Sequence, residues 1–326
     1  MTPFCSTIIP TVGRSSLDRA VASVLQQALT DAGHEVIVVN DSGAPLPPAT
    51  WQGDPRTRIL HTNQRERSMA RNSGAAAAHG RFLHFLDDDD SLAPDALQHF
   101  YALAAQSDAA WLYGGSQLVD RQGQPLIQLH HQLVGNCFLQ VMAGEWVPLQ
   151  ASLIDSAAFF ACGGFHPLLS GPEDIDLLRR IALRYDLAGT TAVVASITRG
   201  DAGSTTDYAH HPEQSRRARE QILAAPEVWP RLRHAAAQQV KHTAAWHGRI
   251  ARIYLTSLVW NLQRRRMWTA ASRAVYGLAA CLLAGPRLAS GSFWHAMRHP
   301  YASETFARGF AAAQGVTGEV QLLRRS

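Results

Sequence analysis

The chain has 326 residues, of which 46% are hydrophobic and 17% are charged. That length can bury a substantial core in one large or two small domains, and the composition excludes a disordered or low-complexity protein. Residues 1–190 contain 12 Arg and 19 Asp or Glu, a net charge of −7, whereas residues 191–326 contain 17 Arg, one Lys and 7 acids, a net charge of +11. This division predicts an acidic half that handles a cation and a basic half that meets an anionic partner.

We expect neither a membrane-spanning helix nor a signal peptide in this sequence. The longest uncharged apolar run, Ala274–Pro286, is shorter than the ~20 residues that span a bilayer. The first residues lack a basic region followed by an apolar segment and a cleavage site. No Cys-x-x-Cys pair occurs among the four cysteines, which argues against a zinc or disulfide framework. The sequence therefore predicts a cytoplasmic protein.

The first 115 residues alternate between segments typical of strands and of helices. Strands are predicted at Cys5–Pro10, Glu35–Asn40, Arg58–His61 and Phe82–Leu86, and helices at Ser15–Leu29 and Ser68–His79. We expect Gly80 to end the second helix, and Ser91 to cap a third helix with Pro94 and Asp95 in its first turn. The alternation predicts a mostly parallel sheet with helices on both faces, which binds ligands beyond the carboxyl ends of its strands.

The later part of the chain is mixed and then helical. A strand is predicted at Trp111–Val119, a helix from Gly171 through Arg184, and a last strand at Val193–Arg199. Beyond the loop Gly200–Tyr208 the pattern is helical throughout, with apolar residues at four-residue spacing from Ile250 and arginines alongside.

A run of four aspartates, Asp87 to Asp90, directly follows the apolar segment Phe82–Leu86. One interpretation is a structural acidic turn, but a solvated charge run has no reason to follow a buried strand. Four adjacent carboxylates repel one another, and a divalent cation that bridges substrate phosphates would relieve that repulsion. Hard oxygen ligands favour Mg²⁺ or Mn²⁺, so the run predicts metal–phosphate chemistry.

Asp41 is a second polar group placed directly after a buried strand. It either caps a turn with Ser42 or accepts a hydrogen bond from a nucleotide base or ribose hydroxyl. The sequence has no Gly-x-Gly-x-x-Gly loop after the first strand, no Gly-x4-Gly-Lys-Ser/Thr and no nucleophile elbow. Dinucleotide oxidoreductases, P-loop kinases and serine hydrolases are therefore disfavoured.

Six segments carry a recognisable order of motifs. They are Ser6–Thr11, Glu35–Gly43, Ala70–Gly74, Gly80–Asp90, Gly163–Phe165 and Glu173–Arg180. In this order they resemble the inverting family 2 glycosyltransferases, over roughly residues 4–205. The resemblance implies an α/β protein with the GT-A fold of nucleotide-diphospho-sugar transferases.

The resemblance also implies a donor site. Asp41 is similar to the carboxylate that contacts the nucleotide base, with Pro10 and Thr11 lining the base and ribose pocket. Arg71 is expected either to support the donor site or simply to pair with an acid.

The metal and the base are implied in the same way. Asp87 and Asp89 resemble the family's Asp-x-Asp motif, with Asp89 as the main ligand of Mn²⁺ or Mg²⁺ and Asp88 as a neighbour that contacts ribose. Asp174 resembles the catalytic base that takes the proton of the acceptor hydroxyl; a helix-end acid favoured by the helix dipole is the alternative.

Weaker expectations concern the acceptor side. Trp146 and Gln150 are candidates for binding an acceptor sugar, and Glu173 stands beside the base. Arg199 and the loop after it occupy the place of a mobile loop over donor and acceptor.

The basic tail has two interpretations. It packs against the catalytic domain with solvated arginines, or its arginines and tryptophans lie on an anionic membrane face. The second interpretation uses Arg249, Arg252, Arg264–Arg266, Arg273, Trp260 and Trp268. No nucleic-acid-binding motif accompanies the charge, so nucleic acid is not an expected partner.

The sequence thus predicts three consecutive parts: a nucleotide-sugar-binding half (1–115), an acceptor-side half of the same domain (116–210) and a helical basic extension (211–326). The expected function is inverting transfer of a sugar, from UDP most often in such families, to a glycan or lipid-linked acceptor in polysaccharide biosynthesis. The alternatives are a nucleotidyltransferase and a catalytically silent relative that acts as a binding module. The expected location is cytoplasmic, including the inner face of the membrane as a peripheral protein.

Overall fold

The computed structural model describes residues 2–29, 32–169, 171, 173–198, 212–238 and 240–298. These residues divide into two compact units. The first unit draws on ranges 1–135, 147–168 and 185–202, and the second on ranges 136–146, 169–184 and 203–326. The units interleave along the chain. The three consecutive functional parts stay a prediction.

The first unit contains the strands of the described chain and four helices. The strands are β1 (Cys5–Thr11), β2 (His34–Asn40), β3 (Thr57–His61), β4 (Phe82–Phe85), β5 (Ser91–Leu92), β6 (Trp111–Val119), β7 (Pro125–Leu129), β8 (Ser152–Asp155) and β9 (Leu187–Thr198). The helices are α1 (Leu17–Leu25), α2 (Arg67–Ala76), α3 (Ala96–Ala104) and α5 (Ser156–Ala161). Short 3₁₀ turns occur at Thr50–Gly53 and Leu149–Ala151.

The second unit is helical wherever it is regular. Its helices are α4 (Phe138–Ala143), α6 (Glu173–Arg184), α7 (Pro212–Leu223), α8 (Val228–Gln238), α9 (Val240–Gln263), α10 (Met267–Ala284) and α11 (Gly291–Arg298), with a 3₁₀ turn at Gly285–Ala289.

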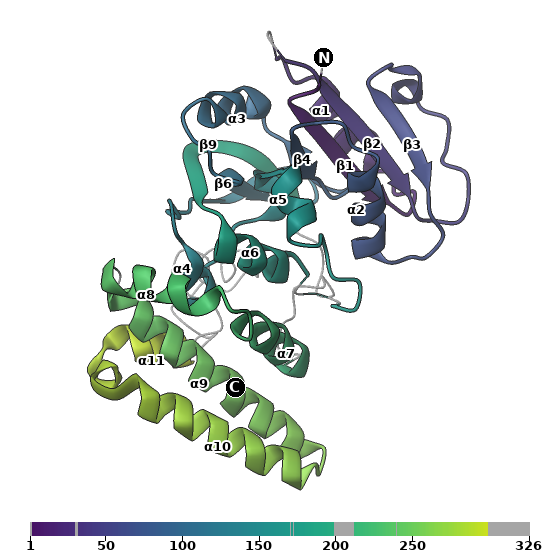
Figure 1. The fold of residues 1–326 in the computed structure, drawn as a ribbon. Helices are drawn as coiled ribbons and strands as arrows, with labels where there is room; N and C mark the ends of the chain where they lie inside the picture. Colours follow the sequence, from purple (N-terminus) through teal and green to yellow (C-terminus); the bar gives the residue numbers. More distant parts are fainter. Residues whose placement is uncertain are drawn as a thin grey trace. The chain divides into compact units, whose positions relative to one another are not determined.

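The strands form one mixed sheet, drawn in Figure 1, in the order β3-β2-β1-β4-β8-β6-β9-β5, with β7 paired to β6. The first four strands are parallel, so their carboxyl ends share one edge. After β4 the sheet turns antiparallel through β8, and only β6 and β9 pair in parallel again. The expected parallel sheet is therefore correct for the edge at which the polar clusters lie.

Alternation along the strands sends apolar side chains to both faces of the sheet. Ile9 and Val38 join α1 and α3 in the core on one face. On the other face α2 packs so tightly on β1 that a Cβ at Gly74 would lie 2.4 Å from the Ile8 side chain. Phe85 contacts Phe159 of α5 on this second face, with ring centroids 5.3 Å apart. Helices on both faces confirm the expected α/β class.

Two expected helix ends are wrong. Helix α2 ends at Ala76 with Ala77 as its C-cap, and Gly80 instead permits the chain to pass β1, because a Cβ there would lie 2.5 Å from the Ser6 nitrogen. Ser91 begins the short strand β5 rather than a helix, because it pairs with β9. Helix α3 starts five residues later, with Asp95 as its N-cap in a left-handed conformation (φ 59°).

One segment of the second unit bears on the expectation about membrane spans, which stays a prediction. Among the described residues, 267–289 form a helical stretch of 23 residues with an 18-residue window of mean hydropathy 1.2, long and apolar enough to cross a membrane by length and composition alone. The sequence argument considered only the uncharged run 274–286, whereas this stretch also includes Arg273 and Arg287.

Candidate active site

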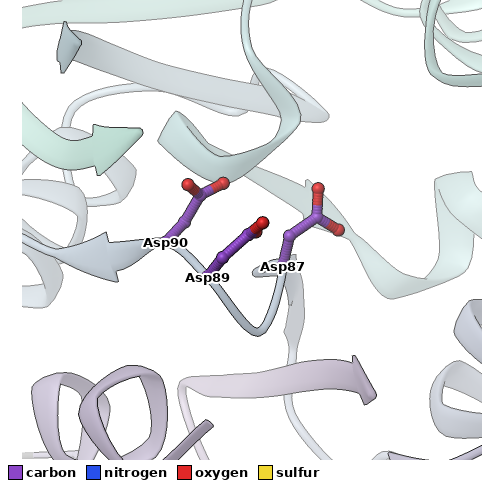
Figure 2. Close-up of side chains that lie close together, drawn as sticks. All are labelled: Asp87, Asp89 and Asp90. Atoms are coloured by element: carbon purple, nitrogen blue, oxygen red, sulfur yellow. The ribbon is translucent and has the colours of Figure 1, made fainter. Parts of the chain in front are cut away.

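Three carboxylates converge just beyond β4. One oxygen from each of Asp87, Asp89 and Asp90 lies within 4.8 Å of the others. Figure 2 shows the three side chains gathered along the turn that leaves the strand. The sequence predicted Asp87 and Asp89 at this place and missed Asp90, although its position next to Asp89 was a signal. Three hard oxygen donors at this spacing suit Mg²⁺ or Mn²⁺.

Asp87 is held by two donors from distant parts of the first unit. Arg71 Nη2 donates to Oδ1 at 2.6 Å and Gln150 Nε2 donates to Oδ2 at 3.0 Å. Burial would raise the pKa of Asp87, but the charges of Arg71 and Arg67 and these hydrogen bonds outweigh it and lower the pKa. Asp87 is therefore an ionised, fixed anchor of the cluster.

Asp88 has hydrogen-bond donors of its own. Its carboxylate accepts a hydrogen bond from Thr11 Oγ1 at 2.6 Å and from Arg14 Nη1 at 2.8 Å. Arg14, which is more than half exposed, also reaches Asp89 Oδ2 at 3.0 Å. The predicted donor-site residues Thr11 and Asp88 thus contact each other at the carboxyl end of β1.

The remaining acids carry an excess of negative charge. Burial raises the pKa of Asp88 and of Asp89, and the nearby charge of Asp87 adds to the effect. For Asp90 burial and the charges of Asp87 and Asp89 raise the pKa well above its ordinary value, although the Thr198 N–H donates to it at 2.7 Å. A bound cation is the group that would compensate this charge.

Helix α2 carries the Ala-Arg-Asn motif, which contacts the Gly-Gly-Phe motif. Asn72 exchanges two hydrogen bonds with the backbone of Phe165, donating from Nδ2 at 2.8 Å and accepting at Oδ1 at 2.9 Å. A Cβ at Gly164 would lie 2.8 Å from the Asn72 amide oxygen, and Gly164 has φ +64°. The Arg71 guanidinium lies 5.4 Å from the Phe165 ring centroid. The Ala-Arg-Asn and Gly-Gly-Phe motifs together aim Arg71 at Asp87.

A buried histidine supports the same anchor. His84 lies within hydrogen-bond distance of Thr7 Oγ1 (3.2 Å) on β1 and of the Gln150 carbonyl oxygen (2.9 Å). Burial lowers the pKa of His84 to about 4, so the ring is neutral and donates one N–H to that carbonyl. This fixes the 3₁₀ turn that carries Gln150. The sequence predicted Gln150 only as an acceptor-side residue, and nothing in the sequence alone linked it to Asp87.

Asp41 organises the loop between β3 and α2. Its carboxylate accepts hydrogen bonds from Thr62 Oγ1 (2.9 Å) and from the backbone N–H groups of Gln64 and Glu66 (both 2.8 Å). Burial would raise the pKa of Asp41, but these hydrogen bonds lower it, so the side chain is ionised. Pro10 lies one residue from the end of β1, beside β2. Contact of Asp41 and Pro10 with a nucleotide base remains a prediction.

The predicted base belongs to the second unit. Asp174 lies in the first turn of α6, where its Oδ1 accepts from the Ile175 N–H at 2.7 Å. Glu173 is buried and accepts from the Gly171 N–H at 3.0 Å, and Asp176 pairs with Arg180 at 2.8 Å. Trp146 is half-buried in the same unit. Arg199 and the loop 200–211 lie outside the described residues.

Comparisons with known proteins agree with this geometry. The model of the family "Glycosyl transferase family 2" matches residues 6–163. The succinoglycan biosynthesis protein ExoO of Rhizobium meliloti is 34% identical over 111 residues, covering 33% of this chain and 31% of ExoO. The poly(ribitol-phosphate) beta-N-acetylglucosaminyltransferase TarP of Staphylococcus aureus is 30% identical over 115 residues, covering 33% of this chain and 35% of TarP. The alignments therefore span about a third of the length of these curated relatives.

The fold has a solved counterpart. The crystal structure of S. aureus TarS 1–349 in complex with UDP-GlcNAc matches with a TM-score of 0.57 at 14% identity, over 82% of this chain and 90% of that chain. At this identity the likeness shows the fold alone, a mixed sheet flanked by helices with further helices at the carboxyl end. Residues 6–163 are thus a glycosyl transferase family 2 domain, and the protein has the GT-A-like fold of TarS.

Proposed function

We propose that this protein is an inverting, metal-dependent glycosyltransferase of the hexosyltransferase type. It takes the sugar from a nucleotide donor, with UDP as the favoured nucleotide, and transfers it to a glycan or lipid-linked acceptor in polysaccharide biosynthesis. The observation that carries the proposal is the cluster of Asp87, Asp89 and Asp90 within a family 2 domain. The co-crystal of TarS with UDP-GlcNAc supports the choice of nucleotide.

We assign different residues to the leaving-group side and to the acceptor side of the anomeric carbon. Asp87, Asp89 and Asp90 would hold the cation, which when bound stabilises the negative charge that develops on the departing diphosphate. Thr11, Asp88 and Asp41 would bind the nucleoside, and Arg71 would keep Asp87 ionised and in place. Asp174 would accept the proton of the attacking hydroxyl on the opposite face of the sugar. The proposed location is the inner face of the membrane, where a lipid-linked acceptor is found.

Thermal unfolding with a panel of UDP, dTDP, GDP and CMP, each with and without Mn²⁺, tests the donor site. A ligand at 100 times its Kd stabilises the fold by roughly 2.7 kcal/mol. We expect a Mn²⁺-dependent shift with one nucleoside diphosphate, UDP. The absence of a shift with every nucleotide would favour the silent binding module instead.

A pair of acid-to-amide variants tests the assignment of roles. We expect Asp174→Asn to lower kcat by at least about 10²-fold while Mn²⁺-dependent UDP binding stays unchanged, because a base acts only on the acceptor. Asp89→Asn should lose both the transfer activity and the Mn²⁺-dependent binding of UDP. Asp108→Asn, an exposed acid after α3, is the control. Full activity of Asp174→Asn would overturn the assignment of the base, and release of pyrophosphate in place of UDP would indicate a nucleotidyltransferase.

A further inference from the structure

The helices α9 and α10 of the second unit lie side by side in Figure 1, and small residues fill the space between them. The buried residues of α10 are Ala270, Gly277, Ala280 and Ala284. Ala244 and Ala251 of α9 join this core together with Phe293 of α11. The interior of this helical layer therefore buries little apolar area per residue.

The large apolar side chains of the same helices point to the outside. Those exposed are Leu255, Val259 and Leu262 of α9 and Met267, Trp268, Val275, Tyr276, Leu278, Leu282 and Leu283 of α10. Trp268 is 91% exposed, Leu282 70% and Leu283 74%. Trp268, Val275 and Leu282 recur every seven residues and so form one row along α10. We call this set the apolar face.

This arrangement is the reverse of an ordinary amphipathic helix. In a water-soluble protein the large apolar side chains of a surface helix face the core. In lipid, small residues lie between helices and large apolar residues face the acyl chains. An exposed apolar surface of this extent indicates an interaction site.

The charge around the apolar face selects the partner. Residues 228–303 contain 11 Arg or Lys and no Asp or Glu. Arg264, Arg265 and Arg266 connect α9 to α10 and are exposed. The guanidinium groups of Arg264 and Arg266 lie 3.8 and 5.5 Å from the ring centroid of Trp260. Cations and tryptophans beside an apolar face suit the headgroup layer of an anionic bilayer.

Two arginines expected to contribute to such a surface do not. Arg249 is buried and donates from Nε to the Ala143 carbonyl at 2.9 Å, and Arg252 donates to the carbonyls of Met297 and Arg298 at 3.2 and 2.7 Å. They fasten α9 to α4 and α11. Tyr254 also donates to Glu220 of α7 at 2.7 Å. Because α9 is tied to polar partners along its length, α10 lies along the unit rather than leaving it to cross a bilayer.

We propose that the apolar face binds the surface of an anionic lipid bilayer, with Trp268, Leu282 and Leu283 among the acyl chains and Arg264–Arg266 at the phosphate groups. A second copy of the chain is a poorer occupant, because it would bring two acid-free, positively charged surfaces together. Membrane binding by this face does not depend on the proposed catalysis. It would hold the protein at the membrane location proposed above.

Co-sedimentation of the full chain with vesicles, without any nucleotide, tests the proposal. We expect binding to phosphatidylcholine vesicles that contain 30% phosphatidylglycerol, and at least tenfold weaker binding to pure phosphatidylcholine. Salt at 0.5 M should weaken the binding, and an alkaline carbonate wash should release the protein. Equal binding to both vesicles would overturn the charge argument, and retention after the wash would indicate a spanning helix instead.

Matched substitutions locate the surface. We expect L282Q/L283Q to weaken vesicle binding about tenfold or more, and Leu168→Gln, an 81% exposed leucine of the first unit, to leave it unchanged. R264Q/R266Q should also lose about tenfold, whereas R217Q/R233Q removes two exposed charges of α7 and α8 with a smaller loss. Equal losses in target and control would overturn the proposal.

A readout that does not depend on affinity completes the test. Brominated lipids quench tryptophans that enter the acyl region, so Trp268→Phe should lose part of the quenching and Trp229→Phe, 62% exposed on α8, should not. If the protein dimerises in solution, and L282Q/L283Q abolishes the dimer while vesicle binding is absent, the face belongs to a second copy and the proposal is wrong. An unchanged circular dichroism spectrum and melting temperature in each variant show that it is folded, and a missing transferase activity would leave the vesicle result standing.

Discussion

A buried acid lies beside each end of strand β1: Glu35 of β2 at the amino end, and Asp88 after β4 at the carboxyl end. The surroundings of the two acids differ. At the amino end the Glu35 carboxylate accepts hydrogen bonds from Ser6 Oγ (2.6 Å), Arg58 Nη2 (2.6 Å) and the His79 N–H (2.7 Å). At the carboxyl end Thr11 Oγ1 donates to Asp88, the second member of a four-aspartate run. Glu35 thus has three donors, whereas Asp88 and Asp89 share Arg14.

The pKa values of the two ends differ accordingly. Burial would raise the pKa of Glu35, but the hydrogen bonds of Ser6, His79 and Arg58 lower it. Burial and neighbouring carboxylates raise the pKa of Asp88, Asp89 and Asp90. Glu35 is thus stabilised as an anion by its donors, whereas Asp88, Asp89 and Asp90 retain a repulsion that a bound cation would relieve.

The largest effect is expected for Asp89→Asn. Removal of one cation ligand should lower transfer by roughly 10³-fold, because a metal contributes several kcal/mol to the stabilisation of the leaving group. Isothermal titration should show Mn²⁺ affinity reduced by at least tenfold. The melting temperature should not fall, because the variant removes a repelling charge. An unchanged Mn²⁺ affinity would refute the assigned metal site.

Gln150→Ala should weaken Mn²⁺ binding by about 10- to 100-fold, because it removes the amide that orients Asp87. Gln128→Ala, an exposed glutamine on β7, is the matched control.

Substitutions of His84 test its support of the turn that carries Gln150. His84→Gln, whose amide still donates to the Gln150 carbonyl, should retain most of the Mn²⁺ affinity, and His84→Leu should not. If His84→Leu loses stability but keeps its Mn²⁺ affinity, His84 has only a structural role.

Removal of the acid charge is expected to change the stability in opposite directions at the two ends of β1. Glu35→Gln should lower the free energy of unfolding by about 2 kcal/mol at pH 7, because Arg58 and two further donors lose a charged acceptor. Asp90→Asn should raise it by about 1 kcal/mol, because it relieves repulsion. Chemical denaturation measures both. A loss of stability in Asp90→Asn would mean that the acidic cluster is a structural turn.

The effect of Glu35 also has a defined pH dependence. Its pKa is lower in the folded state than the ordinary value of 4.5, so its contribution is complete above that value and disappears as the pH falls through the folded-state pKa. The difference between the wild type and Glu35→Gln should therefore close in acid. A constant difference down to pH 3 would show that packing, not charge, causes the loss.

The smallest effect is expected at Arg14, which pairs with both Asp88 and Asp89 while more than half exposed. An exposed ion pair is worth less than about 1 kcal/mol, so Arg14→Gln should tighten Mn²⁺ binding only about two- to threefold by removing a competing cation. Arg121→Gln removes the same charge from the turn after β6 and should have no effect. Weaker Mn²⁺ binding in Arg14→Gln would contradict competition.

The sequence by itself determined the four parallel strands β1 to β4 of the first unit and the chemistry at their ends. Short apolar runs that stop at Asp41 and at Asp87 predict buried strands with polar carboxyl ends, and parallel strands bring such ends to one edge. Local chemistry of this kind is readable because cause and effect lie within a few residues. The ends of α2 and α3 were not, because contacts with β1 and β9 override the local signals of Gly80 and Ser91.

Only the tertiary structure decided which side chains meet. Gln150 lies 63 residues from the aspartate that it holds, and Arg249 lies 106 residues from the carbonyl that it binds. Such pairs depend on how elements pack, and no local pattern distinguishes an arginine that faces inward from one that faces a membrane. The seven-residue rows of small and large residues on α10 were present in the sequence. Packing against α9 decided that the small row is inside, because close approach of two helices needs small side chains.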